Sequence, residues 1–297
     1  MKFGIFYEHQ LPRPWSADSE HRLLQESLTQ IELADRLGYD YAWEVEHHFL
    51  EEYSHSSAPE VFLGAASQRT KRIRLGHGII QLPTNHPIRV AERVATLDLL
   101  SGGRVELGLG EGQGPIELHP FGRRVRDKRD VWEEAVQVMV QCFTRDAVEF
   151  HGSYFDFPAR NVIPKPFQKP HPPLWVACSN ISTIGSAGQW GMGALGFQFV
   201  TPEAARAWVH RVLHQPDPAV DQARRLPDES QRRHGERVHV RAHGRRGAGE
   251  GGGLDVLRVL PLHYGRNGMA SRGGEHVGAL PGMAAHAEGA GDAARRG

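Results

Sequence analysis

The sequence predicts an α/β fold of alternating strands and helices, and within this class it favours a (β/α)8 TIM barrel. Short apolar runs alternate with amphipathic segments over about two hundred residues, a pattern typical of parallel sheets. The strand candidates are apolar on both faces, as expected for parallel strands that are covered on both sides. No Gly-x-Gly-x-x-Gly turn follows the first strand, which disfavours a dinucleotide-binding sheet.

The first part of the predicted barrel has well-marked boundaries. Apolar residues recur at helical spacing between Ser19 and Leu37, and Gly38 then occupies the position of a C-cap glycine. The elements predicted up to residue 109 are strands at 2–7, 41–45, 73–80 and 104–109, and helices at 19–37, 59–68 and 87–100.

The alternation continues as far as residue 213, with longer connections. Here the sequence predicts helices at 127–143, 182–190 and 202–213, and strands at 174–178 and 194–199. Six strands are two fewer than a closed (β/α)8 barrel requires. We therefore expect residues 1–213 to form a barrel portion that is incomplete at its C-terminal end.

The composition changes after Leu213. From Pro216 onwards there is no Lys, Trp or Phe, and this stretch holds 16 of the 34 glycines. Few large apolar residues remain to offset the entropy of ordering the chain, so a disordered basic tail is one interpretation of residues 214–297. We favour another, in which this region is translated in a shifted frame of a GC-rich gene, because it begins where further strands are expected.

The charge balance and the cysteines narrow the class of protein. Lys plus Arg and Asp plus Glu both number 35, so nothing favours nucleic acid or an anionic membrane as a partner. Cys142 and Cys178 form neither a disulfide framework nor a zinc pattern, which suits a reducing cytoplasm. The first residues resemble a strand rather than a signal peptide, and no apolar run approaches the ~20 residues of a membrane helix.

The run WEVEHHF places an acid and two imidazoles at the end of the second predicted strand. In a barrel, the carboxyl ends of the strands carry the chemistry. Neighbouring residues of a strand point to opposite faces, so His47 and His48 are not expected to share a metal. A histidine there is well placed as a general base, because its unperturbed pKa is about 6.5. A metal-dependent barrel hydrolase that pairs one of these histidines with distant ligands stays open.

Three further loops follow predicted strands. Gly78-Ile79 lies at a strand end where a missing side chain lets a bulky planar ligand approach the backbone. The run LGLGEGQGPIELHPFG, which contains Glu111, could wrap a phosphate or a ring system but matches no P-loop spacing. Ser179, Asn180, Ser182 and Thr183 surround the start of a helix, where side-chain donors and free backbone N–H groups form an anion site.

The chain up to about Leu213 resembles the bacterial luciferase-like family of flavin-dependent monooxygenases. The segments that carry the resemblance are MKFGIFYEHQLPRPW, ELADRLGYDYAWEVEHHF, LGHGIIQLPTNHPIRVAERVATLDLLSGGRVELGLG, NVIPKPFQKPHPPLWVACSN and GMGALGF. The resemblance implies a luciferase-like (β/α)8 barrel that binds reduced, diffusible FMN and uses O2 to oxygenate a small organic substrate. It also implies a partner flavin reductase that supplies FMNH2, and a homodimer.

The resemblance also assigns roles to residues of this sequence. It makes His47 the acid or base near the flavin, with Glu46 beside it, orienting it or hydrogen-bonding to it, and it marks Gly78-Ile79 as the site of an unusual peptide bond under the flavin ring. Ser179, with Ser182 and Thr183, matches the phosphate-binding loop. Glu111 stands where luciferases have an arginine, and Arg129 could supply that charge instead. Rival interpretations are a hydride-transferring relative that uses a deazaflavin and a flavin-binding protein without catalysis.

Overall fold

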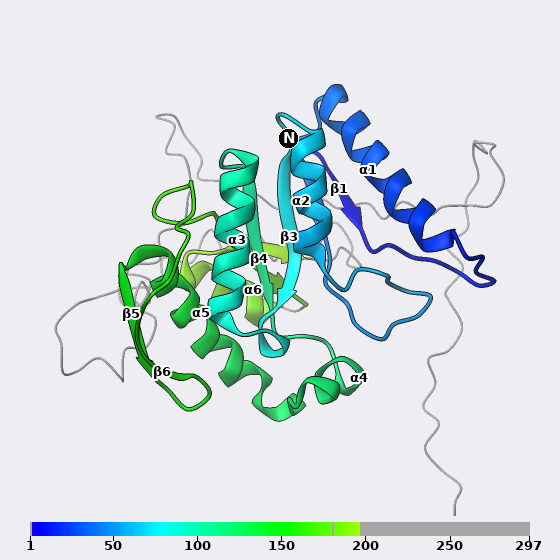
Figure 1. Cartoon of the computed structure of the whole chain (residues 1–297). Coiled ribbons are helices and arrows are strands. Elements are labelled where there is room, and N and C mark those ends of the chain that lie inside the picture. Colours follow the sequence, from blue (N-terminus) through cyan, green and yellow to red (C-terminus); the bar gives the residue numbers. More distant parts are fainter. Residues whose placement is uncertain (1, 180, 197–297) are drawn as a thin grey trace, which may run out of the picture. The chain divides into compact units, whose positions relative to one another are not determined.

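A computed structural model of the chain describes residues 2–179 and 181–196, and within them six parallel strands form one curled sheet (Figure 1). The strand order is β1-β2-β3-β4-β7-β8, and every neighbouring pair is parallel. The strands are β1 (Gly4–Tyr7), β2 (Tyr41–Glu44), β3 (Arg74–Gln81), β4 (Val105–Gly110), β7 (Leu174–Cys178) and β8 (Gly193–Gly196). This arrangement confirms the predicted portion of a parallel α/β barrel.

Helices connect consecutive strands and cover one face of the sheet, where α1, α2, α3 and α5 pack in sequence order (Figure 1). They are α1 (Ser19–Leu37), α2 (Pro59–Arg69), α3 (Pro87–Ser101), α5 (Lys128–Thr144) and α6 (Ile181–Trp190), and short helical turns occur at α4 (Pro115–Leu118), Leu82–Thr84, His119–Phe121 and Val125–Asp127. The predicted bounds of the five long helices hold to within one residue. Gly38 ends α1 as expected, with a φ of 86°.

Two apolar layers hold the sheet in place. One lies between the strands and the helices, and the other lies inside the curl of the sheet, where Tyr41, Trp43 and Trp175 pack with Phe6 and Leu195. The inner layer fills the barrel below the carboxyl ends of the strands. It therefore forms the floor on which a site at those ends rests.

The prediction that the strands are apolar on both faces was too simple. Glu44, His77 and Glu106 are buried on β2, β3 and β4. Glu106 accepts hydrogen bonds from Arg74 and from Trp175 Nε1, and Glu44 accepts one from Ser56. Buried carboxylates are tolerated because such donors replace water.

The antiparallel hairpin of β5 (Ala147–His151) and β6 (Asp156–Asn161) was not predicted. In β5 only Val148 and Phe150 are buried, so its period-two pattern is too short to stand out. The predicted strand at 194–199 corresponds to β8, but residues 197–199, the predicted helix at 202–213 and the region 214–297 lie outside the described residues. Within the described residues, no helix is both long and apolar enough to cross a bilayer.

Candidate functional site

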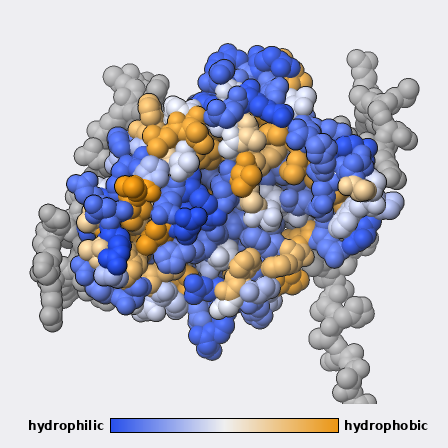
Figure 2. Space-filling view, in the orientation of Figure 1, coloured by the Kyte–Doolittle hydropathy of each residue, from blue (hydrophilic) through white to orange (hydrophobic). Residues whose placement is uncertain are grey.

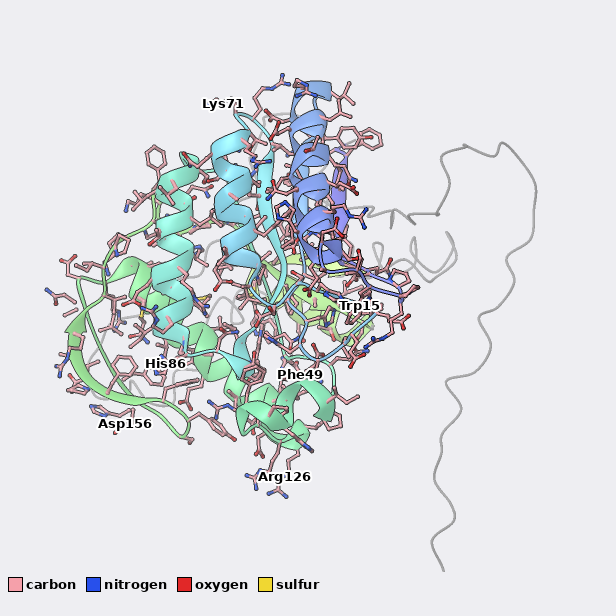
Figure 3. All side chains as sticks on the ribbon, turned by 45° about the vertical axis from the view of Figure 1, so that its right-hand side comes forward. Trp15, Phe49, Lys71, His86, Arg126 and Asp156 are labelled. Atoms are coloured by element: carbon pink, nitrogen blue, oxygen red, sulfur yellow. The ribbon has the colours of Figure 1, made fainter. Side chains whose placement is uncertain are left out.

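A cavity of about 580 Å³ opens at the carboxyl ends of the strands. In Figure 3, Phe49, which follows β2, marks the carboxyl ends of the strands. Lys71, which precedes β3, marks the opposite ends. Apolar side chains form most of the wall, and polar groups gather on the loops after β2, β3, β4 and β7. The residues that line the cavity include Phe6, Trp43, Glu46, His47, Tyr53, Gly78, Ile79, Gln81, Gly110, Glu111, Lys128, Ser179 and Thr183.

His47 lies in this wall and is held on both sides by carboxylates. Its Nδ1 is 2.9 Å from Oε1 of Glu117, and its Nε2 is 3.6 Å from Oε2 of Glu8. The backbone N–H of His47 donates to the carbonyl of Ser56, and the ring meets Tyr53 edge-on at 5.5 Å. The imidazole is therefore fixed in position, with Nδ1 facing the carboxylate of Glu117 and Nε2 facing that of Glu8.

The two carboxylates differ in their proton affinity. Burial tends to raise the pKa of Glu117, but hydrogen bonds from His47, Gln81 and the backbone of His48 hold that pKa below its usual value. For Glu8 burial is the largest effect and raises the pKa, against the attraction of His47 and a hydrogen bond from Tyr53. Ionised Glu117 accepts the Nδ1 proton of His47, which leaves Nε2 to exchange a proton on the side of Glu8.

Glu46 does not touch His47 in the way the resemblance implied. Its Oε1 lies 3.0 Å from Nε2 of His48 and accepts a hydrogen bond from Asn85 at 2.8 Å, and its Oε2 accepts a hydrogen bond from the backbone N–H of Gln81. The expected orienting contact to His47 is made by Glu117 instead. The reason is geometric, because Glu46 and His48 lie two residues apart and project to the same side.

The peptide bond between Gly78 and Ile79 is cis, at the position that the resemblance marked. The pairing of β3 with β4 shifts register between His77 and Ile80, so the chain bulges there. A Cβ on Gly78 would lie 3.2 Å from the ring of Phe6, and one on Gly110 would lie 2.5 Å from Cδ1 of Ile79. Glycine at both positions therefore lets the side chains of Phe6 and Ile79 pack close to the backbone in the cavity wall.

The cations near the loop after β4 are arranged differently from the expectation. Arg129 donates to Glu111 at 2.8 Å and to Glu133 at 2.6 Å, and it is not part of the cavity wall. Lys128, the preceding residue, does line the cavity and donates to the carbonyl of Gly112. Glu111 is thus paired with Arg129 and also lies 4.0 Å from Nζ of Lys128, and of these two cations Lys128 is the one that lines the cavity.

The predicted anion site is described only in part. Ser179 and Thr183 line the cavity at the start of α6, on the wall that follows β7. Asn180 lies outside the described residues, and the side chain of Ser182 is also outside them. Within the described residues, no group of three or more His, Cys, Asp or Glu side chains could hold a metal ion.

Sequence reasoning missed Glu8, Tyr53, Gln81, Glu117 and Lys128. The contact between His47 and Glu117 spans 70 positions of the chain, and no local pattern signals such a pair. One clue was available in the sequence. Glu117 and Lys128 follow the glycine-rich loop after β4, and in a barrel the segments after the strands face the site.

The chain was compared with known protein families and with curated proteins. A family model described as luciferase-like monooxygenase matches residues 1–221. The chain is 35% identical over 199 residues to 4-hydroxyprotoasukamycin monooxygenase of Streptomyces nodosus subsp. asukaensis, which covers 64% of this chain and 53% of that protein. It is 29% identical over 198 residues to the oxygenase component of the flavin-dependent trigonelline monooxygenase of Acinetobacter baylyi, which covers 64% of this chain and 52% of that protein. The chain spans about half the length of the curated relatives it matches.

Solved structures show the same fold. The monooxygenase RslO1 from Streptomyces bottropensis superposes with a TM-score of 0.66 at 31% identity, covering 75% of this chain and 67% of that one. The oxygenating constituent of a 3,6-diketocamphane monooxygenase from Pseudomonas putida, solved with FMN, gives 0.63 at 20% identity, with 74% and 65% covered. An F420-dependent secondary alcohol dehydrogenase gives 0.56 at 23% identity, with 72% and 66% covered. The last two comparisons concern the fold alone.

Proposed function

The chain belongs to the luciferase-like monooxygenase family, and from this premise we propose that its site serves a monooxygenase that uses reduced FMN and O2 to oxygenate a small organic substrate. The observation that carries the proposal is the position of His47, which Glu117 holds at 2.9 Å in the wall of a cavity with a glycine cradle. A separate flavin reductase would supply the reduced FMN, in keeping with the relative named as an oxygenase component. A cytoplasmic location and a homodimer belong to the same proposal.

The cavity fits a flavin in three respects. Gly78 and Gly110 both line the cavity, where a missing side chain lets a planar ring approach the backbone. Ser179 and Thr183, with Asn180 and Ser182, would hold the phosphate at the start of α6. Lys128 would supply the positive charge that Arg129 cannot, since Arg129 is committed to Glu111 and Glu133.

Reduced FMN, when bound, would supply the electrons for the reaction with O2. The protein would exclude water with its apolar wall and manage protons through His47. Ionised Glu117 keeps the proton on Nδ1, so Nε2 can accept a proton from the reacting groups and return it. Glu8, whose pKa burial raises, is placed to exchange that proton with Nε2.

The lining of the cavity indicates the chemical class of the substrate. Phe6, Trp43, Tyr53 and Leu195 offer aromatic and aliphatic surface, and Lys128 is assigned above to the phosphate of the flavin. Little charge would therefore remain to bind a charged substrate. We propose an apolar substrate with one oxidisable group, such as an alkene, a ketone or an aldehyde.

The test is to titrate the full chain with FMN by fluorescence and then to follow O2 uptake with FMN reduced by an added reductase. In a panel of apolar alkenes, ketones and aldehydes, the parent protein is expected to yield an oxygenated product. His47→Asn should consume O2 and release hydrogen peroxide with product reduced by roughly 100-fold, because proton management by a positioned side chain typically contributes that much. Exposed His119→Asn is the matched control and should behave as the parent.

Two results would overturn the proposal. Product formation by His47→Asn at the parent rate would remove His47 from the reaction. Reduction of substrate by reduced deazaflavin without O2 uptake, together with no binding of FMN, would assign the site to hydride transfer instead.

A further inference from the structure

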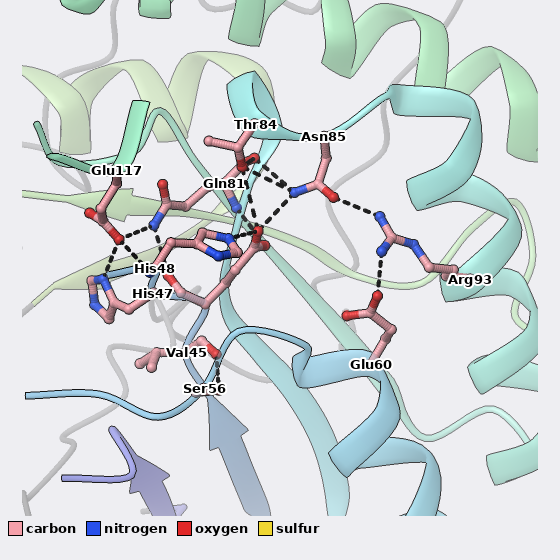
Figure 4. Close-up of polar contacts among 11 residues, drawn as sticks. Val45, His47, His48, Ser56, Glu60, Gln81, Thr84, Asn85, Arg93 and Glu117 are labelled. Atoms are coloured by element: carbon pink, nitrogen blue, oxygen red, sulfur yellow. Dashed lines mark hydrogen bonds and ion pairs between the residues drawn. The ribbon is translucent and has the colours of Figure 1, made fainter. Parts of the chain in front are cut away.

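Gln81 lies between the two acids of the site. It is the last residue of β3, directly beyond the bulge at Gly78 and Ile79, and it is 1% exposed. Its side-chain Nε2 donates to Oε1 of Glu117 at 2.7 Å and to the backbone carbonyl of Glu46 at 2.8 Å. Its backbone N–H donates to Oε2 of Glu46 at 3.0 Å, and its side-chain contact with Glu117 is drawn in Figure 4. One residue therefore ties β3 to the end of β2 and to α4.

These contacts fix which way the amide of Gln81 points. Both partners of Nε2 are acceptors only, so the opposite orientation would set the amide oxygen against two oxygens. The orientation has a cost, because Oε1 of Gln81 is buried with no hydrogen-bond donor among the described residues. An unsatisfied buried acceptor is tolerated only where the opposite end of the group makes stronger contacts.

Glu117 depends on this donor. Its Oε1 accepts three hydrogen bonds, from His47 Nδ1, from the backbone of His48 and from Gln81, and its Oε2 is buried without a partner in the described part of the chain. The other two donors belong to the loop that also carries the imidazole. Gln81 is the donor that anchors Glu117 from a strand, so its loss would free the carboxylate and weaken its charged form.

We propose that Gln81 is a positioning residue that holds Glu117 in place and aimed at Nδ1 of His47, so that Nε2 of His47 points towards Glu8. The titratable groups that face His47 are Glu117 on α4, Glu8 after β1 and Tyr53 in the loop after β2. Its catalytic meaning rests on the proposed function, but its geometry does not. This role goes beyond that of His47, since it names the group that holds Glu117 in place beside the imidazole.

The experiment measures proton binding in the flavin-free full chain, by following the ring proton resonances of His47 by NMR as the pH is varied. Gln81→Met keeps the length of the side chain but removes the donor. His47 should then bind its proton three- to tenfold less tightly, because a displaced or protonated Glu117 stabilises the imidazolium less. Gln113→Met, at an exposed glutamine of the same cavity wall, is the matched control and should leave the titration unchanged.

A double-variant cycle separates this role from a general structural one. Glu117→Gln should lower the proton affinity of His47 by itself, and adding Gln81→Met should then cause no further change, since Gln81 acts through Glu117. Gln81→Asn is the second variant, in which a shortened amide keeps the site polar but withdraws the donor, and it should shift the titration in the same direction.

Unchanged titration of His47 in both folded Gln81 variants would overturn the proposal, as would full additivity with Glu117→Gln. Because no flavin or substrate is present, these outcomes are independent of the tests of monooxygenase activity. A His47 that titrates as proposed in a chain that forms no product would contradict the proposed function alone.

Discussion

The acid that orients His47 could not be read from the sequence, although His47 itself could. Adjacency favoured Glu46, which is next to His47 in the chain, but a strand end turns neighbouring side chains apart. Glu117 reaches the imidazole from α4, a helix of four residues with no periodic signal. The same holds for the cation near the loop after β4, where the sequence marked Arg129 and the fold places Lys128 in the cavity wall instead.

His77 should make the folding free energy depend on pH. It is fully buried on β3, and burial lowers its pKa to about 4 from a usual 6.5. The unfolded chain therefore binds more protons than the folded one below pH 6.5, so the stability contributed by neutral His77 is present above that pH and is lost towards pH 4. Each pH unit in this window costs up to about 1.4 kcal/mol.

The check is urea unfolding at several pH values for the parent and for His77→Leu. The variant should lose roughly 2 kcal/mol less than the parent between pH 6.5 and pH 5, because leucine takes up no proton. Exposed His119→Leu serves as the control and should follow the parent. Equal acid sensitivity of the parent and His77→Leu would show that His77 does not carry this effect.

At the scale of secondary-structure elements, most of the fold follows from local patterns. Gly38 ends α1, and Gly102 ends α3 with a φ of 66°, so both helix ends are marked by the one residue that adopts this conformation freely. The hairpin of β5 and β6 was missed because its pairing is set by contact with the rest of the fold, which the sequence pattern of so short a strand does not report.

Two glycines, Gly38 at the end of α1 and Gly64 inside α2, should change the stability of the protein in opposite directions when replaced by alanine. Gly38 has a φ of 86°, so Gly38→Ala should destabilise the protein by about 1 kcal/mol although no atom lies within 4 Å of the new Cβ. Gly64 lies inside α2 with equally open space, so Gly64→Ala should stabilise by about 0.5–1 kcal/mol. Urea midpoints measure both, and a stabilised Gly38→Ala would contradict the capping role.

The inner layer of the sheet repeats one packing arrangement. The ring of Trp43 on β2 lies over Gly76 on β3, and the ring of Trp175 on β7 lies over Gly193 on β8. A Cβ on Gly76 would come within 2.2 Å of Trp43, which is almost completely buried and cannot move aside. Gly76→Ala should therefore cost about 3 kcal/mol by overpacking.

The matched control for this steric effect is Gly114→Ala. Its φ of −153° suits any residue, and no atom lies within 4 Å of the new Cβ. Chemical denaturation of the two variants compares them directly. A loss of stability in Gly76→Ala no larger than that in Gly114→Ala would show that Trp43 can repack.

At the scale of the whole molecule, the described sheet is open. Among the described residues β1 pairs with β2 alone and β8 with β7 alone, whereas a closed (β/α)8 barrel has eight strands without edges. The face shown in Figure 2 carries several separate hydrophobic patches among hydrophilic residues. The exposed large side chains include Leu33, Leu37, Val61, Leu99 and Leu100. The alternation of strands and helices made the barrel predictable, but the composition after Leu213 left its completion to be tested.

The shifted-frame hypothesis gives a prediction for the stability of the entire chain. Unpaired edges and apolar helix surface lower the free energy of unfolding and loosen a cavity built from strand ends. The chain as written should therefore melt at a lower temperature, and bind FMN at least tenfold more weakly, than a version whose codons after Leu213 are returned to the alternative frame. Resequencing the gene around the codons for Leu213 to Pro216 tests the origin of the change, while circular dichroism melts and FMN titrations of both versions test its consequence. A cooperative melt with stoichiometric, tight FMN binding by the chain as written would contradict the prediction, because a site assembled from the ends of the six described strands and α6 would then be sufficient to bind the flavin.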